Sequence, residues 1–225
     1  MSLFNMHFDT YTLLQIFTKV VIVFLILPIH EFAHAWAAHK MGDDTAKYMG
    51  RLTLNPLAHV DWIGAICLVL TGFGWAKPVP INPVKFRKPR FGTAITAAAG
   101  PISNIIVAFL ALVVYRILAC TSFVTGSGDM PYFVMYMLSF FVQVNIGLAI
   151  FNLIPIPPLD GSKILQYFTS AKFDRFVAQY SQVISMAFLV IVVSGVLSAP
   201  LGWLSGKILD FFWLITGFIP KLMGA

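Results

Sequence analysis

The chain consists of long apolar runs that are separated by only three polar stretches of more than a few residues. These stretches cover about 43–55, 77–90 and 163–175, and each is too short to fold as a separate domain. Hydrophobic residues make up 59% of the sequence and charged residues 11%, whereas charged residues form about a quarter of a typical soluble domain. The sequence therefore predicts an all-α polytopic membrane protein.

The apolar runs predict about five to six transmembrane helices in one membrane-embedded domain of residues 1–225. We expect a catalytic core at about 10–165 and an accessory helical hairpin at about 176–223. Pro28 should bend the first helix, because proline removes a backbone hydrogen bond. The expected helices, in chain order, are 10–40, 91–118, 131–155, 176–197 and 201–222.

The segment 60–76 is apolar, but it is short and rich in glycine, and Lys and Arg residues flank it on both sides. Because basic residues favour the cytoplasmic side of a membrane, equal flanks indicate a segment that returns to the side it left. We therefore expect an irregular or re-entrant segment between the first and second clear spans. Prolines in the following 78–83 stretch predict an extended loop.

The distribution of charge predicts a multi-pass protein of the cell (plasma) membrane. Lys and Arg gather in the short polar stretches, and the loop at 125–129 contains neither, so we place that loop outside. The formal net charge is +6, but no basic face with interleaved aromatic residues is present, which excludes a nucleic-acid partner. The lipid bilayer is the expected environment.

The sequence His30-Glu31-Phe32-Ala33-His34 closes the first apolar run. On a helix, the four-residue spacing turns the rings of His30 and His34 toward one metal ion, and Glu31 lies beside them as a candidate general base. Neutral imidazole is a common ligand of zinc. Ionisable residues at membrane depth are costly and mark functional sites. The pattern predicts one Zn²⁺ per chain, in a site that opens toward the cytoplasm.

A catalytic zinc ion needs a third protein ligand. Asp160 is a candidate, because the Pro-Pro-Leu-Asp-Gly sequence at 157–161 interrupts the apolar run and places a carboxylate at membrane depth. The same pattern is typical of a turn or of a helix N-cap. His59 and Asp61 are competing candidates, so spacing alone leaves the third ligand open.

Several other polar residues are candidates for binding substrate. Asn145 and Asn152 lie seven residues apart, hence on one helix face, where their amides could bind a substrate backbone or stabilise an oxyanion. Hydrogen bonding between helices is the alternative for both, and for Asn104. Pro80 and Asn82 lie in the extended loop, which could hold an unwound substrate as an added strand.

Three sequence runs together resemble the site-2 protease family of intramembrane zinc metalloproteases, peptidase family M50, in its compact form without a PDZ or CBS domain. The resemblance implies that His30, His34 and Asp160 bind zinc, that Glu31 is the general base and that Asn152 assists catalysis. The runs are His30 to His34, Gly100-Pro101-Ile102-Ser103-Asn104 and Asn152-x-x-Pro155-x-x-Pro158-Leu159-Asp160-Gly161.

The resemblance implies hydrolysis of peptide bonds within or near the transmembrane segments of other membrane proteins. The expected partner is a transmembrane protein or peptide substrate, and a second copy of the chain is a candidate partner in a homodimer. A metal-ion transporter or channel lined by intramembrane His and Asp residues is the alternative. That class predicts internal repeats, and the sequence shows none.

Overall fold

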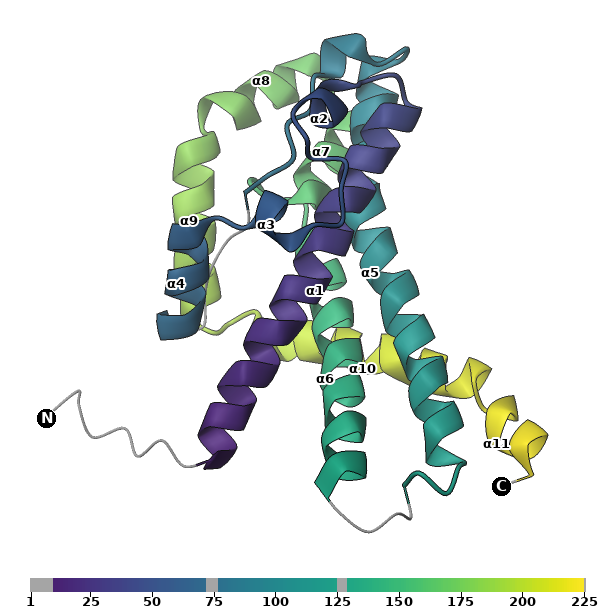
Figure 1. The fold of residues 1–225 in the computed structure, drawn as a ribbon. Helices are drawn as coiled ribbons and strands as arrows, with labels where there is room; N and C mark the ends of the chain where they lie inside the picture. The colour runs from purple at the N-terminus through teal and green to yellow at the C-terminus, as the bar shows by residue number, and fades with distance from the viewer. Residues whose placement is uncertain (1–9, 72–76, 125–128, 225) are drawn as a thin grey trace, which may run out of the picture.

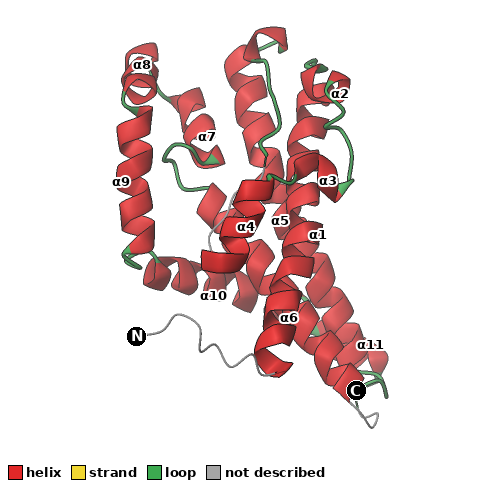
Figure 2. Ribbon diagram, turned by 60° about the vertical axis from the view of Figure 1, so that its left-hand side comes forward, coloured by secondary structure: helices red, strands yellow, loops and turns green. Residues whose placement is uncertain are grey.

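A computed structural model describes residues 10–71, 77–124 and 129–224. These residues form helices joined by loops, as the all-helical prediction requires (Figures 1 and 2). Three parts of the sequence lie outside these described residues: His7, residues 72–76 of the expected re-entrant segment, and residues 125–128 of the expected outer loop. The helices are α1 (Thr10–Lys40), α2 (Thr45–Tyr48), α3 (Pro56–His59), α4 (Trp62–Thr71), η1 (Pro83–Lys85), α5 (Pro89–Ala119), α6 (Asp129–Asn152), α7 (Asp160–Phe168), α8 (Ala171–Gln179), α9 (Ser181–Val193), α10 (Ser198–Ile215) and α11 (Phe218–Met223).

The first helix, α1, has the predicted bounds and contains Pro28 in its interior. It ends at a tight turn in which Gly42 has φ 105°, a conformation that favours glycine. The short helices α2 and α3 follow, so the polar stretch at 43–55 folds back along the end of α1.

Two of the described helices, α5 and α6, are long and apolar enough to cross a membrane, and a third span exists if α8 and α9 count as one. The two helices of that pair are bent by 69° at their junction. The protein is therefore a membrane protein, and its described residues contain two or three candidate spans, whereas we expect five to six from the sequence. With 10 residues, α4 is about 15 Å long, and the re-entrant path of 60–76 stays a prediction.

Among the described helices, α5 has the most extensive packing, and its neighbours are α1, α6 and α7. Small buried residues on α5, among them Ala97, Gly100 and Ala108, allow its neighbours to approach closely. In Figure 1, α1, α5 and α6 lie side by side and α10 runs across them. The C-terminal half of α1 therefore lies between α5, which contacts His30 and His34, and the polar loops, which pack on Ala35.

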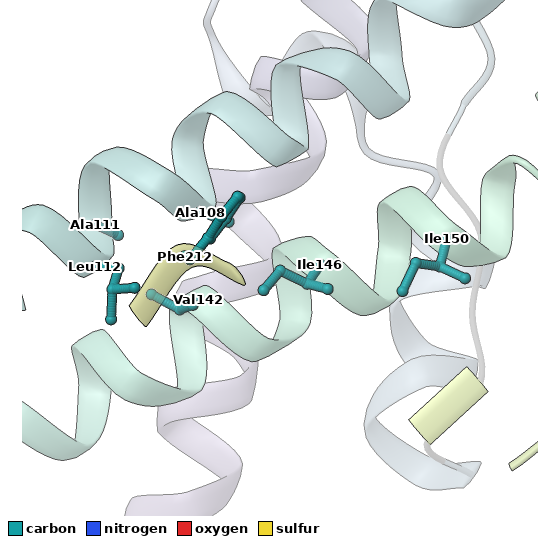
Figure 3. Close-up of a cluster of buried hydrophobic side chains, with 7 residues drawn as sticks. All are labelled: Ala108, Ala111, Leu112, Val142, Ile146, Ile150 and Phe212. Atoms are coloured by element: carbon teal, nitrogen blue, oxygen red, sulfur yellow. The ribbon is translucent and has the colours of Figure 1, made fainter. Parts of the chain in front are cut away.

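One hydrophobic cluster joins the later helices to this bundle (Figure 3). It contains small and branched residues of α5 and α6, and Phe212 of α10 packs against them. The sequence places the break before α10 at Ala199–Gly202, whereas the structure places it at 194–197, where Gly195 has φ 76°. Pro200 lies in the first turn of α10, which tolerates proline. The cluster consists of Ala108, Ala111, Leu112, Val142, Ile146, Ile150 and Phe212.

Candidate metal centre

Three buried side chains from two distant parts of the chain meet at one point. His30 and His34 project from α1, and Asp160 is the first residue of α7. One ligand atom from each lies within 4.8 Å of the other two. The Nε2 atoms of the two histidines are 3.0 Å apart, and Asp160 Oδ2 is 3.4 Å from His30 Nε2 and 3.1 Å from His34 Nε2. Their exposed fractions are 5%, 6% and 8%.

The cluster depends on a close approach between α1 and α5. His30 and His34 stack edge to face, with ring centroids 4.6 Å apart, because they lie one turn apart on α1. Gly100 of α5 lies against both rings. A Cβ atom at this position would lie 2.6 Å from His30 Cε1 and would also overlap the ring of His34. Only glycine leaves room for both imidazoles.

A backbone carbonyl sets the tautomer of His34. The Nδ1 atom of His34 lies 2.7 Å from the carbonyl oxygen of Thr96 on α5. Since a carbonyl only accepts hydrogen bonds, Nδ1 carries the proton and the Nε2 lone pair faces the cluster. A metal-binding histidine needs this tautomer.

The geometry of the donor atoms fits a zinc ion. Two imidazole nitrogens and a carboxylate oxygen are common zinc ligands, and tetrahedral bonds of about 2.0–2.1 Å place neighbouring donors about 3.3 Å apart. The observed separations of 3.0, 3.1 and 3.4 Å agree with that value. Three lone pairs directed at one buried point repel one another unless a cation lies between them.

The turn before α7 brings Asp160 to the histidines. A Cβ atom at Gly161 would lie 2.5 Å from the carbonyl oxygen of Ile154, so the turn requires glycine there. The other carboxylate oxygen of Asp160, Oδ1, lies 3.6 Å from Lys163 Nζ. The competing candidates have other partners, since His59 Nε2 lies 2.8 Å from the Thr53 carbonyl oxygen and Asp61 Oδ1 accepts hydrogen bonds from the first turn of α4.

Glu31 lies next to this cluster and contacts an extended segment that we call the strap, residues 77–82. The Val79 amide donates a hydrogen bond to Glu31 Oε2 at 3.1 Å. Arg51 Nη2 donates to the carbonyl oxygens of Lys77 and Pro78, the latter at 3.3 Å. The far end of the strap is bound as well, because the Asn82 amide donates to Asp43 Oδ2 at 2.6 Å.

Asp43 is fully buried at the turn that follows α1, where its carboxylate also accepts hydrogen bonds from the amide and hydroxyl of Thr45. Burial alone would raise the pKa of Asp43. The hydrogen bonds from Thr45 and the Asn82 amide, with the charge of Lys85, outweigh that effect and hold the pKa below its ordinary value of 3.8. Asp43 is therefore an ionised anchor of the strap at neutral pH.

The asparagines predicted to bind substrate use their amide nitrogens within their own helices. Asn145 Nδ2 donates to the Phe141 carbonyl at 2.9 Å, and Asn152 Nδ2 donates to the Leu148 carbonyl at 3.0 Å. Asn104 is fully buried, and neither amide atom has a partner within the described residues. Substrate binding by these three residues stays a prediction.

The two strap residues predicted to bind substrate differ in their contacts. Pro80 is half-buried, and Asn82 Oδ1 accepts a hydrogen bond from the Val84 amide at 3.2 Å at the start of η1. Their contact with substrate also stays a prediction. Sequence reasoning missed the strap anchors Arg51 and Asp43, because the polar stretch that contains them resembles an ordinary solvated loop.

The sequence of this chain is similar to those of known proteins. The sequence model of peptidase family M50 matches residues 18–194. The predicted zinc metalloprotease YwhC of Bacillus subtilis (strain 168) is 38% identical over 181 residues, which cover 78% of this chain and 80% of YwhC.

Two more distantly related proteins carry the same description as YwhC. The predicted zinc metalloprotease Rip2 of Mycolicibacterium smegmatis is 27% identical over 83% of this chain and 69% of Rip2. The predicted zinc metalloprotease MJ0611 of Methanocaldococcus jannaschii is 27% identical over 73% of this chain and 77% of its own length. No solved structure matches the chain significantly.

Proposed function

The chain belongs to peptidase family M50, and on this premise we propose that it is a zinc metalloprotease that cuts peptide bonds within or near the transmembrane segments of other membrane proteins. The observation that carries the proposal is the buried His30, His34 and Asp160 cluster next to Glu31. We assign the three cluster residues as ligands of one zinc ion per chain and Glu31 as the general base.

When bound by these residues, zinc would supply Lewis acidity toward the scissile carbonyl and toward a water molecule. Glu31 takes a proton from the attacking water and passes it to the leaving amine. The Val79 amide holds the carboxylate of Glu31 through its hydrogen bond to Oε2. The Thr96 carbonyl keeps the proton of His34 on Nδ1 throughout, so that Nε2 stays a ligand.

The substrate has to be unwound before it can react, because a helix uses its carbonyls in internal hydrogen bonds. We propose that the unwound segment lies along the strap near Pro80 and Asn82, with Asn152, Asn145 and Asn104 as further polar contacts. The strap passes Glu31, which supports this placement. The site would open toward the cytoplasm, with the basic polar stretches on that side.

We also assign residues 10–165 as the catalytic core and the hairpin at about 176–223 as accessory to it. All of the proposed ligands and the base lie within the first range. The expected state is a multi-pass protein of the plasma membrane. The second copy in a homodimer stays a candidate partner.

The deciding experiment compares the parent with Glu31→Gln in detergent, using zinc content and cleavage of a single-span substrate. Glu31 is not a ligand, so both proteins should retain about one zinc per chain, while the variant loses about 10²–10⁴-fold in cleavage rate. Asp210→Asn is the matched control, because it changes an exposed carboxylate in α10 to an amide. Equal cleavage by the Glu31→Gln variant would remove Glu31 as the base. Bound zinc without cleavage of any single-span substrate would favour a transporter.

A further inference from the structure

The strap is held near both ends and in the middle, where its partner is Glu31. At the near end, the Lys77 amide donates to the His59 carbonyl at 2.9 Å. The Val79 amide donates to Glu31 Oε2, and the Asn82 amide donates to Asp43 at the far end. At the near end, one nitrogen of Arg51 donates to the carbonyls of Lys77 and Pro78, the two residues that precede Val79. The side chain of Val79 is itself buried against Ala35 and Ala46. The strap thus has little freedom to move relative to α1.

Arg51 has an unusual environment for an arginine. Only 6% of it is exposed, and within the described part of the chain no carboxylate forms an ion pair with it. The charge of Glu31 acts on the guanidinium from beyond ion-pair distance, and burying a charge without a direct ionic partner is unfavourable. Within the described residues, the hydrogen bonds of its side chain go to the two strap carbonyls, which points to a role in holding the strap.

The path from Arg51 to Glu31 is short and stiff. The carbonyl of Lys77 and the amide of Val79 belong to adjacent peptide units joined at Pro78, and the Pro78 carbonyl shares one planar peptide unit with the Val79 amide. Proline fixes its own φ, and Pro80 restricts Val79 to extended conformations. A displacement of the two carbonyls is therefore passed to the Val79 amide without being absorbed by backbone rotation.

We propose that Arg51 is a positioning residue for Glu31: by binding the carbonyls of Lys77 and Pro78 it fixes the Val79 amide, and that amide orients the Glu31 carboxylate. This inference rests on the proposed role of Glu31 as general base. It assigns Arg51 to the reaction although Arg51 contacts neither the zinc ligands nor the reacting atoms.

The first test is the kinetics of Arg51→Met on the full-length chain in detergent. Loss of a residue that orients a catalytic group lowers the rate by about 10–100-fold. We expect this fall in kcat with KM changed by less than about twofold, since the interaction acts on the transition state, and with zinc content unchanged. Arg87→Met is the matched control, because Arg87 is exposed; its kcat should equal that of the parent.

The Arg51→Lys variant tests whether the strap needs the guanidinium group itself or only a donor nitrogen at this position. A single nitrogen of Arg51 makes both hydrogen bonds, and the ammonium of lysine is a compact donor that can make both as well. Arg51→Lys should therefore recover kcat to within about tenfold of the parent.

Hydrogen exchange of the strap gives a readout that does not depend on catalysis. Pro78 and Pro80 have no amide hydrogen, so the strap carries only the amides of Lys77, Val79, Ile81 and Asn82. Exchange at Val79 should accelerate in Arg51→Met and in Glu31→Ala, and should stay at the parent rate in Arg87→Met. Unchanged protection of Val79 in Arg51→Met would overturn the proposal.

A second variant removes the proposed hydrogen bond directly. Val79→Pro deletes the amide hydrogen, and proline suits an extended segment that already contains Pro78 and Pro80. We expect the same fall in kcat as for Arg51→Met, with zinc retained. Parent kcat in Val79→Pro overturns the proposal even if Arg51→Met does not fold. A rise in KM at parent kcat would overturn it too, since the strap would then serve substrate binding alone.

The two hypotheses fail in different ways. If Glu31→Gln cleaves as well as the parent, Glu31 is not the general base, and the positioning role of Arg51 fails with that assignment. If Glu31→Gln is inactive while Arg51→Met retains zinc and parent kcat, the positioning role fails and the proposed function stands.

Discussion

A single methyl group at residue 100 would prevent His30 and His34 from facing one metal ion together. Gly100 lies against both rings, and a Cβ atom there would overlap the ring of His34 and lie 2.6 Å from His30 Cε1. The pattern of His30 and His34 could be predicted from the sequence because their spacing is local to one helix. The contact with Gly100 and the hydrogen bond from His34 to the Thr96 carbonyl could not, because both depend on how α1 and α5 pack.

Gly100→Ala should therefore reduce zinc binding. The added methyl group must displace one of the rings, and overpacking of this kind costs about 1–3 kcal/mol. We expect zinc content well below one per chain and a lower melting temperature, measured by metal analysis and thermal unfolding. Gly147→Ala is the control, because a Cβ atom at Gly147 on α6 meets nothing within 4 Å. A Gly100→Ala variant with full zinc content would show that the rings can move without loss of binding.

At the scale of elements, the site depends on the turn after α1 and on the strap, which is hydrogen-bonded to Asp43 in that turn and to Glu31. The bounds of α1 and a non-helical loop from residue 78 could be predicted, because helix length and proline content are local properties, although η1 begins at Pro83, inside the predicted 78–83 loop. The anchoring of the strap could not, because Asp43 and Arg51 reach it across the fold. The third ligand was also ambiguous until α7 placed Asp160, and not His59 or Asp61, at the histidines.

Asp43→Asn should loosen the strap and lower stability at neutral pH. The variant loses charge-assisted hydrogen bonds from Thr45 and Asn82, which corresponds to about 1–3 kcal/mol in the free energy of unfolding. The measurement is thermal unfolding at pH 7, with Asp210→Asn as an exposed control. Equal melting temperatures for Asp43→Asn and the parent would contradict the anchoring role.

The same carboxylate predicts a pH dependence. Because the folded protein holds the pKa of Asp43 below 3.8, its contribution to stability is fully present above that value and is lost as the pH falls through the folded pKa. The difference in melting temperature between parent and Asp43→Asn should be constant from pH 7 to about pH 5 and shrink below about pH 4. A difference that does not change with pH would assign the effect to packing.

At the scale of the molecule, the buried aromatic side chain of Phe212 helps to join α10 to α5 and α6. Phe212 is 5% exposed and packs edge to face on Phe109 of α5, with ring centroids 5.3 Å apart. An all-helical membrane protein could be predicted from composition. The packing of α10 across α6 could not be predicted, because contacts between distant apolar helices leave no periodic signal in the sequence.

Phe212→Ala should destabilise the whole bundle without removing zinc from the molecules that stay folded. The cavity costs about 3 kcal/mol, near the lower end of the range for buried phenylalanine, because lipid weakens the hydrophobic contribution between helices. Phe211→Ala is the neighbouring control, since Phe211 is 57% exposed. Thermal unfolding should show a large shift only for Phe212→Ala. Equal shifts for both variants would mean that α10 does not stabilise the bundle through this contact.

The position of Asp160 in the chain has a consequence during synthesis of the protein by the ribosome. The helix with both histidines leaves the ribosome first, and the carboxylate that completes their cluster emerges on α7, much later along the chain. At about 5–20 residues per second, this delay lasts on the order of ten seconds. During that time, a nascent chain that already carries Glu31 lacks one of the three proposed zinc ligands. The proposed metal centre therefore cannot be complete until α1, α5 and α6 have all been synthesised.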